Sequence, residues 1–256
     1  MILCRFSDAY SEQYGIVQNH KIQPISGDPF GAWESGIVED GPAHEFTDVR
    51  LLCPVVPSKI IGVGLNYRKH AEELNLAIPQ TPVLFMKPPT SVIGSQETII
   101  CPKMSAQVDY EAELAIVIGK PAKNISVDQS AAHIFGYTCM NDVTARDLQK
   151  LDGQWTRAKS FDTFSAIGPW IVTDFDPSNV QIECYLNGEL RQNANTSDMI
   201  FSVPQIVSFV SQIMTLNPGD VITTGTPPGI GPIKKGDTVD VRIDGIGILR
   251  NFVTES

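Results

Sequence analysis

The sequence predicts an α+β fold, in which a mixed sheet arranged as a β-roll or barrel carries a few helices. Short apolar or alternating runs, separated by Gly, Pro, Asn and Asp, recur along the chain and read as strands. The runs lie at 60–64, 83–86, 98–101, 114–118, 134–140, 182–186, 221–224 and 238–243. Helical patterns are fewer and do not alternate regularly with the strands, which argues against a doubly wound parallel sheet.

Four segments predict helices. In 203–214, Pro204 stands in the first turn and apolar residues recur at helical spacing. The segment 67–76 reads as a short helix that ends before Pro79. We also expect helices at 127–133 and 143–150.

The chain divides into two expected units. Residues 1–57 are rich in turn markers and short apolar runs, and predict a small strand-rich N-terminal domain that ends near Pro54 and Pro57. Residues 58–256 hold most of the strand and helix patterns and predict the main domain. A chain of 256 residues is long enough to bury a substantial core in this arrangement.

Composition limits the partners of the protein. The net charge of -10 and the pI of about 4.8 argue against a nucleic-acid surface. No apolar run approaches the ~20 residues that a membrane span needs, and the N-terminal sequence has no secretory signal pattern, so we expect a cytoplasmic protein. The five scattered cysteines fit reduced thiols.

Three carboxylates indicate a metal site. Glu111 and Glu113 stand two residues apart at the start of an apolar run, so in a strand they face the same way beside the core. Burying them costs several kcal/mol for each uncompensated charge. Asp142 follows the apolar run 134–140 and supplies a third oxygen donor, which together describes a magnesium-type site. Taken singly, each carboxylate would be an ordinary solvated side chain.

Two further positions carry candidate chemistry. His70 and Glu73 share one face of the predicted helix, so the carboxylate could orient or charge the imidazole; exposed helices also carry such pairs by chance. Lys159 lies among aromatic residues, which suggests a partly buried cation, although a snorkelling surface lysine is the alternative.

Two glycine-containing segments do not match nucleotide motifs. The run at 62–67 has Tyr67 where a dinucleotide fingerprint needs its third glycine, and 225–229 lacks the Lys and Ser/Thr of a phosphate loop. The backbone N–H groups of 225–229 and the Thr226 hydroxyl could still hold a carboxylate or an enolate oxygen, and a plain turn is the alternative.

Six ordered motifs resemble the fumarylacetoacetate hydrolase family, in the branch of acylpyruvate hydrolases, oxaloacetate decarboxylases and 2-hydroxyhepta-2,4-diene-1,7-dioate isomerases. They are GLNYRKH at 64–70, FMKPP at 85–89, DYEAE at 109–113, NDVTARDLQ at 141–149, KSFD at 159–162 and TGTPPG at 224–229. The resemblance covers the chain from about residue 58 onwards. It implies a β-roll with surrounding helices, a homodimer, and a Mg²⁺ or Mn²⁺ ion.

The resemblance also implies roles for individual residues. The metal ligands fall on Glu111, Glu113 and Asp142. His70 and Glu73 would form a water-activating dyad on a short lid helix, with Lys159 as a further catalytic residue in the pocket. The positions implied for substrate binding or its support are Asn66, Arg146, Gln149 and Thr226.

The expected substrates are small 2-oxo acids with a second carbonyl or carboxylate, which react through a metal-stabilised pyruvate enolate. We expect acylpyruvate-type C–C hydrolysis or oxaloacetate decarboxylation, and the dyad favours the hydrolase. The alternatives are an isomerase or hydratase of hydroxymuconate-type diacids, and a catalytically idle scaffold that binds a metal or a dicarboxylate.

Overall fold

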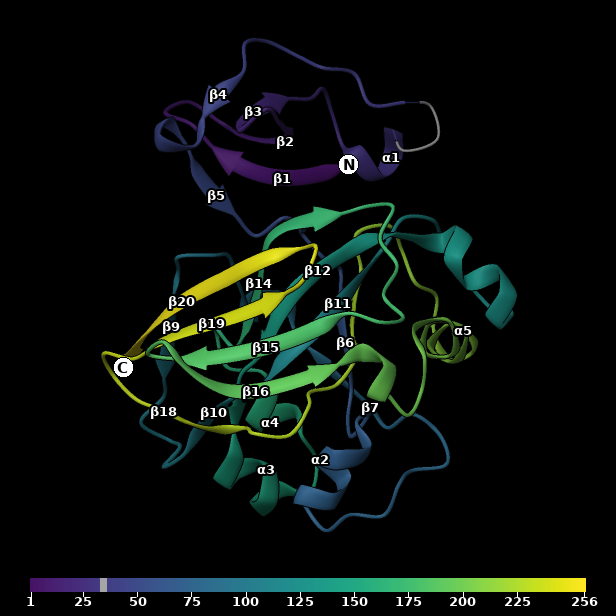
Figure 1. The fold of residues 1–256 in the computed structure, drawn as a ribbon, viewed down its shortest axis with the longest axis vertical. Helices are drawn as coiled ribbons and strands as arrows, with labels where there is room; N and C mark the ends of the chain where they lie inside the picture. Colours follow the sequence, from purple (N-terminus) through teal and green to yellow (C-terminus); the bar gives the residue numbers. More distant parts are fainter. Residues whose placement is uncertain (33–35) are drawn as a thin grey trace.

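The computed structural model describes residues 1–32 and 36–256 and confirms a sheet-rich α+β chain (Figure 1). The strands are β1 Ile2–Ser7, β2 Glu12–Gln18, β3 Lys21–Pro24, β4 His44–Glu45, β5 Arg50–Leu52, β6 Ile60–Val63, β7 Leu84–Lys87, β8 Val92–Ile93, β9 Thr98–Cys101, β10 Val108–Tyr110, β11 Ala112–Ile118, β12 Ile134–Asp142, β13 Thr144–Ala145, β14 Ser165–Val172, β15 Gln181–Leu186, β16 Glu189–Asn195, β17 Val221–Thr223, β18 Gly231–Ile233, β19 Thr238–Ile243 and β20 Gly247–Glu255. The α-helices are α1 Pro29–Ala32, α2 Arg68–Glu73, α3 Arg146–Asp152, α4 Thr156–Lys159 and α5 Val203–Ile213. The 3₁₀ helices are η1 Phe46–Asp48, η2 Pro89–Ser91, η3 Val127–His133 and η4 Thr196–Asp198.

The large sheet runs in the order β4-β3-β2-β1-β14-β12-β11-β17-β6-β7, with β5 paired to β1 and β8 to β14. A second sheet has the order β16-β15-β19-β20-β9, and β13-β10-β18 form a third. Most pairs are antiparallel, but β6 with β17, β8 with β14 and β9 with β20 are parallel, which confirms the mixed character. The β-roll description, the division at residue 57 and the homodimer stay predictions. None of the helices in the described ranges is long and apolar enough to cross a bilayer.

The N-terminal strands are joined to the rest of the molecule through the large sheet. Strands β1 to β5 lie together at one end of the view in Figure 1, and β1 pairs with β14 at Ile2↔Val172 and Leu3↔Ile171. Leu3 is also fully buried in an apolar cluster that includes Phe135 and Ile171. The N-terminal unit therefore contributes to the core as well as to the sheet.

Strands β11 and β12 form the centre of the molecule. Every residue of both strands is buried, because other strands flank them and side chains cover both faces. This explains why their sequences are nearly continuous apolar runs with no polar alternation. Glu113 and Asp142 are acidic exceptions in these two strands, and both are buried near the end of the strand pair where the chain enters β11 and leaves β12.

The predicted strands agree with the structure to within a few residues at their ends. Sequence reasoning did not identify β14, β16 or β20, although β14 is the partner of β12 and joins the N-terminal strands to the sheet.

The helix predictions were less accurate. The helix at 203–214 is confirmed as α5, which a reciprocal capping box of Ser202 and Gln205 begins. The segment 127–133 is a 3₁₀ helix, not an α-helix. The prediction at 143–150 was wrong over its first turn, because Thr144 and Ala145 pair with β10 before α3 begins.

We predict that Gly62→Ala destabilises the fold. Gly62 pairs with Phe85 across β6 and β7, and a Cβ atom there would lie 2.0 Å from Cζ of Phe85. Forcing this contact should lower the free energy of unfolding by about 2 kcal/mol, measured by urea denaturation. The double variant with Phe85→Leu should lose less than the sum of the two single variants, because the smaller side chain makes room. Strict additivity would show that the ring is not the obstacle.

Candidate metal centre and substrate pocket

The structure brings the three predicted carboxylates together. Glu111 stands between β10 and β11, Glu113 is the second residue of β11, and Asp142 ends β12. All three are buried, and one oxygen of each lies within 4.8 Å of the others. Pairing of β11 with β12 sets this arrangement, and the Asp142 N–H donates to the Glu111 carbonyl oxygen at 2.8 Å.

Two buried lysines form ion pairs with Glu111 and Asp142. The Lys159 ammonium donates to Glu111 Oε2 at 2.8 Å and to Asp142 Oδ2 at 2.5 Å. Lys87, at the end of β7, forms an ion pair with Asp142 Oδ1 and donates to the Phe164 carbonyl oxygen at 2.7 Å. Lys159 is therefore buried among carboxylates, and it does not snorkel to the surface.

Lys87 is a site residue that sequence reasoning missed, although it lies inside the FMKPP motif. A lysine at the end of an apolar strand gives little signal of its own, because such a side chain usually extends into water. The informative pattern was the surplus of acidic residues in other motifs, since buried carboxylates need more cations than Lys159 alone provides.

Arg146 ties the cluster to α3. Its Nε donates to Asp109 Oδ2 at 2.8 Å, and its Nη2 forms an ion pair with Glu111. Its Nη1 donates to the Gln149 side-chain oxygen at 2.5 Å. The guanidinium is thus fixed from three sides, which holds the start of α3 against the cluster.

Glu111 and Glu113 have opposite pKa shifts. Burial alone would raise the pKa of Glu111, but Lys159 and Arg146 outweigh it and hold this pKa well below its usual value. Burial, then Asp142 and Glu111, raise the pKa of Glu113 well above its usual value. The environment therefore stabilises the charge of Glu111 and opposes that of Glu113.

Burial also acts on the two lysines. It lowers the pKa of Lys87 despite the contact with Asp142. For Lys159, burial is outweighed by Asp142, Glu111 and Glu113, and the pKa is raised. The Lys159 cation is therefore stabilised by the carboxylates around it.

The surplus negative charge suits a divalent cation. Four carboxylates (Asp109, Glu111, Glu113 and Asp142) meet three cations (Lys87, Arg146 and Lys159). Within residues 1–32 and 36–256, no lysine or arginine forms an ion pair with Glu113, whose Oε2 instead accepts from the Thr223 hydroxyl and from Gly225 N at 2.8 Å. The oxygen donors and the uncompensated charge fit a hard metal ion.

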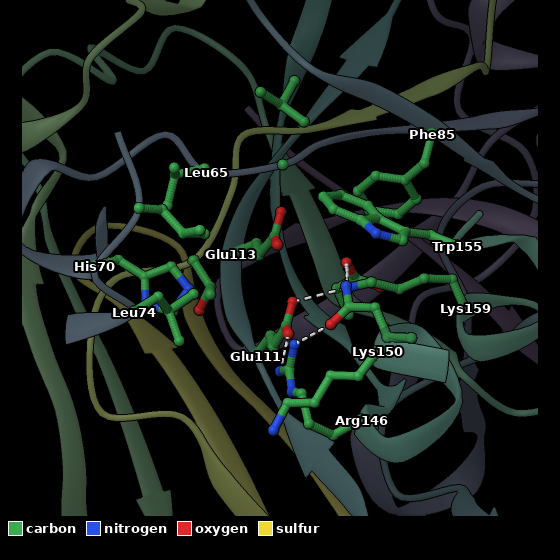
Figure 2. Close-up of a pocket in the computed structure, with 16 residues that line it drawn as sticks. Leu65, His70, Leu74, Phe85, Glu111, Glu113, Arg146, Lys150, Trp155 and Lys159 are labelled. Atoms are coloured by element: carbon green, nitrogen blue, oxygen red, sulfur yellow. Dashed lines mark hydrogen bonds and ion pairs between the residues drawn. The ribbon is translucent and has the colours of Figure 1, made fainter. Parts of the chain in front are cut away.

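The His70 and Glu73 pair forms as the sequence suggested. Both residues lie on α2, and His70 Nδ1 is 2.8 Å from Glu73 Oε2. The other carboxylate oxygen of Glu73 accepts from Gly229 N at 3.0 Å, so the pair is anchored to the 224–229 loop. Figure 2 shows His70 and Lys159 on opposite sides of Glu111 and Glu113. An imidazole therefore faces the carboxylate cluster.

A cavity of about 220 Å³ lies between these groups. The polar or charged residues that line it are His70, Glu111, Glu113, Asp142, Arg146, Gln149, Lys150, Lys159 and Thr226. Its apolar walls come mainly from Leu65, Leu74, Leu76, Phe85 and Trp155. Lys159 also lies over the Phe85 ring, with Nζ 4.8 Å from the centroid. The cavity has room for a small polar molecule.

Asn66 is not among the residues that line the cavity, and its role in substrate binding stays a prediction. Its Nδ2 donates to the carbonyl oxygens of Phe201 (3.1 Å) and Thr224 (2.7 Å), and its Oδ1 accepts from Phe201 N at 2.8 Å. These bonds use the donors and an acceptor of the fully buried amide. Asn66 therefore positions the loops behind the site.

Thr226 lines the cavity, but its hydroxyl is already engaged. It donates to the Ala112 carbonyl oxygen at 2.9 Å and accepts from Gln192 Nε2 at 2.8 Å. Gln192, fully buried in β16, also accepts from Ala112 N at 2.9 Å. Sequence reasoning missed Gln192, because a single glutamine in a weakly patterned strand gives no signal.

The cavity thus combines a histidine–carboxylate pair with buried carboxylates that can hold a divalent metal. These two features define the class of protein to which the chain belongs. A family model described as fumarylacetoacetate (FAA) hydrolase C-terminal matches residues 59–254, and one described as Rv2993c-like, N-terminal, matches 1–54. The chain therefore belongs to the fumarylacetoacetate hydrolase family, as the six motifs implied.

Relatives in this family are named for several reactions. The mitochondrial oxaloacetate tautomerase Fahd2a of Rattus norvegicus is 43% identical over 219 residues, which are 81% of this chain and 70% of the relative. The structure of 5-carboxymethyl-2-hydroxymuconate delta-isomerase from Mycobacterium smegmatis superposes with a TM-score of 0.94 at 43% identity, covering all of both chains. Maleylpyruvate hydrolase from Sphingobium sp. SYK-6, solved with manganese(II) and pyruvate, has a TM-score of 0.85 at 29% identity over all of both chains.

We predict that Glu113→Gln stabilises the metal-free protein. The pKa of Glu113 is higher in the folded than in the unfolded chain, so the wild type loses stability as the pH rises above the ordinary glutamate value of 4.5. At pH 7 to 8 the variant should gain about 1–3 kcal/mol, measured by thermal unfolding in EDTA. Added Mn²⁺ should raise the Tm of the wild type but not that of the variant.

The exposed Glu255→Gln serves as the control for this prediction and should change neither result. Equal stability of Glu113→Gln and the wild type in EDTA would show that the charge of Glu113 is not opposed by its surroundings.

Proposed function

We propose that this protein is a Mg²⁺- or Mn²⁺-dependent enzyme for small 2-oxo acids with a second carbonyl or carboxylate, and that it hydrolyses a C–C bond of acylpyruvate-type 2,4-dioxo acids. The observation that carries the proposal is the His70–Glu73 pair facing the carboxylate cluster across one small cavity. A general base and a cation site then act on one bound molecule.

The metal would be held by Glu111, Glu113 and Asp142. When bound there, a divalent ion supplies a Lewis acid that stabilises negative charge developing on the 2-oxo oxygen. The family likeness supports this assignment, because the Sphingobium hydrolase was solved with manganese(II) and pyruvate.

The side chains of the pocket would transfer the protons and orient the substrate. With its Nδ1–H donating to Glu73, His70 keeps Nε2 as a proton acceptor for a water molecule. That water attacks C4 of the dioxo acid and gives its proton to His70. Cleavage of the C3–C4 bond leaves a carboxylic acid and the enolate of pyruvate, and the imidazolium returns the proton to C3. Arg146, Gln149 and Lys159 line the pocket where they can orient the substrate carboxylate.

A reaction of oxaloacetate is the second candidate, because the rat relative is named an oxaloacetate tautomerase. The same dyad would then remove a proton from C3 and return it to oxygen, with no attacking water. Decarboxylation of oxaloacetate uses the same stabilised enolate and needs no attacking water either. The likeness to the Mycobacterium isomerase keeps proton transfer within a hydroxymuconate-type diacid as a further alternative.

We predict that His70→Asn lowers the rate of hydrolysis by about 10²- to 10⁴-fold, because it removes the proton acceptor. Glu73→Gln should lose less, since it keeps a hydrogen bond to the imidazole but not the charge. Proton NMR of acetylpyruvate, with Mg²⁺ and with EDTA, should show acetate and pyruvate appearing only when the metal is present.

Separate tubes of oxaloacetate distinguish the alternatives. Faster metal- and His70-dependent interconversion of its enol and keto forms, with acetylpyruvate untouched, would establish the tautomerase. Loss of CO₂ above the metal-only background would establish a decarboxylase. If both compounds and a hydroxymuconate diacid remain unchanged, the proposed activity is wrong and the idle scaffold gains support.

A further inference from the structure

Lys150 is a cation of the pocket wall that the proposed reaction does not use. Two other cations of that wall, Arg146 and Lys159, already form ion pairs with Asp109, Glu111 or Asp142. Lys150 is exposed and lines the same cavity, and across residues 1–32 and 36–256 its ammonium has neither an ion pair nor a hydrogen bond. The Lys150 ammonium is therefore available to bind an anionic ligand.

The helix holds Lys150 on the side that faces the pocket. Lys150 follows Arg146 by four residues on α3, so both side chains lie on one face of the helix. Arg146 is fixed by Asp109 and Glu111, which sets the rotation of α3 against the site. Figure 2 shows the long Lys150 side chain beside Arg146.

We propose that Lys150 binds a distal carboxylate of the substrate, so that 2-oxo acids that carry such a group, acylpyruvates included, bind more tightly than those with an uncharged tail such as acetylpyruvate. The inference rests on the proposed function, because that function places the 2-oxo acid group at the carboxylate cluster. The far end of a short substrate then lies in the same small cavity, which the exposed Lys150 also lines.

The charges and walls of the pocket support a second anionic group at this end. Leu74, Leu76 and Trp155 also line the cavity, and an unpaired carboxylate against apolar side chains is unfavourable. An ion pair with the Lys150 ammonium compensates that cost. An uncharged acyl tail would leave Lys150 without a partner and would gain nothing from it.

Two unreactive ligands isolate this contact. Malate and lactate share the 2-hydroxy acid group and differ in that malate carries a distal carboxylate. Their dissociation constants for the Mn²⁺-loaded protein, measured by calorimetry, give a preference ratio that does not depend on turnover. We expect the wild type to prefer malate, and Lys150→Met to reduce that preference about fivefold.

Matched variants control for charge and shape. Lys150→Arg keeps the cation and should retain most of the preference. Lys123→Met removes an exposed lysine that lies outside the cavity and should change nothing. Raising KCl from about 0.05 M to about 0.5 M should weaken the preference of the wild type but not the residual preference of Lys150→Met.

Other outcomes overturn the inference. A preference for malate that survives in Lys150→Met, or a wild type that binds malate no better than lactate, means that Lys150 is a solvated surface lysine. Failure of the proposed function looks different. If the malate preference depends on Lys150 while no 2-oxo acid is turned over, the carboxylate site stands and the proposed catalytic activity is wrong.

Discussion

The buried ionic cluster is the constraint on which the structure depends. Four carboxylates and three cations are removed from water at the centre of the molecule, and each unpaired charge there would cost several kcal/mol. The cations come from β7, α3 and α4, while the carboxylates come from the entry to β11, from β10 and from the end of β12. These strands and helices must therefore keep their positions relative to one another, because displacing one of them leaves a charge in the core without its partner.

The 224–229 loop connects the two halves of the site. Gly225 N donates to the Glu113 carboxylate and Gly229 N donates to that of Glu73, so one short loop holds both a cluster residue and the dyad. Both glycines have positive φ, and a Cβ atom at Gly229 would lie 2.2 Å from the Arg191 carbonyl oxygen. The backbone N–H groups of both residues donate these hydrogen bonds, and the backbone lies so close to neighbouring atoms of the protein that a side chain would not fit. Glycine is therefore required at both positions.

The sequence predicted the parts of the site that carry a local signal. Glu111, Glu113 and Asp142 stand out because acidic residues interrupt apolar strands, and His70 with Glu73 because helical spacing places them on one face. Lys87 and Gln192 have no such signal, since their importance comes from contacts with residues more than 30 positions away. Asn66 illustrates a related limit, because a motif indicates that a residue is needed but not whether it contacts the ligand or the backbone.

Prediction of the fold was limited in the same way, because local patterns indicate single elements but not contacts between distant segments. Apolar runs located eight of the strands, and Pro204 with apolar residues at helical spacing located α5, because these signals depend on nearby residues. Pairing of β1 with β14 joins segments about 170 residues apart, and pattern alone does not report it. The segment expected to form the first turn of the helix at 143–150 pairs with β10 instead. Backbone pairing with Asp109 and Val108 outweighs the local helical preference there.

In the function proposed above, the groups that transfer protons differ from those that select the substrate. The carboxylate cluster and the dyad would remove a proton either from water or from a carbon next to a carbonyl, so they would not choose between hydrolysis and tautomerisation. That choice depends on which carbon of the substrate is placed near His70. In this proposal its placement depends on the other groups that line the cavity, among them the apolar side chains after α2 and Lys150 of α3. We therefore expect relatives named for different reactions to differ at these walls.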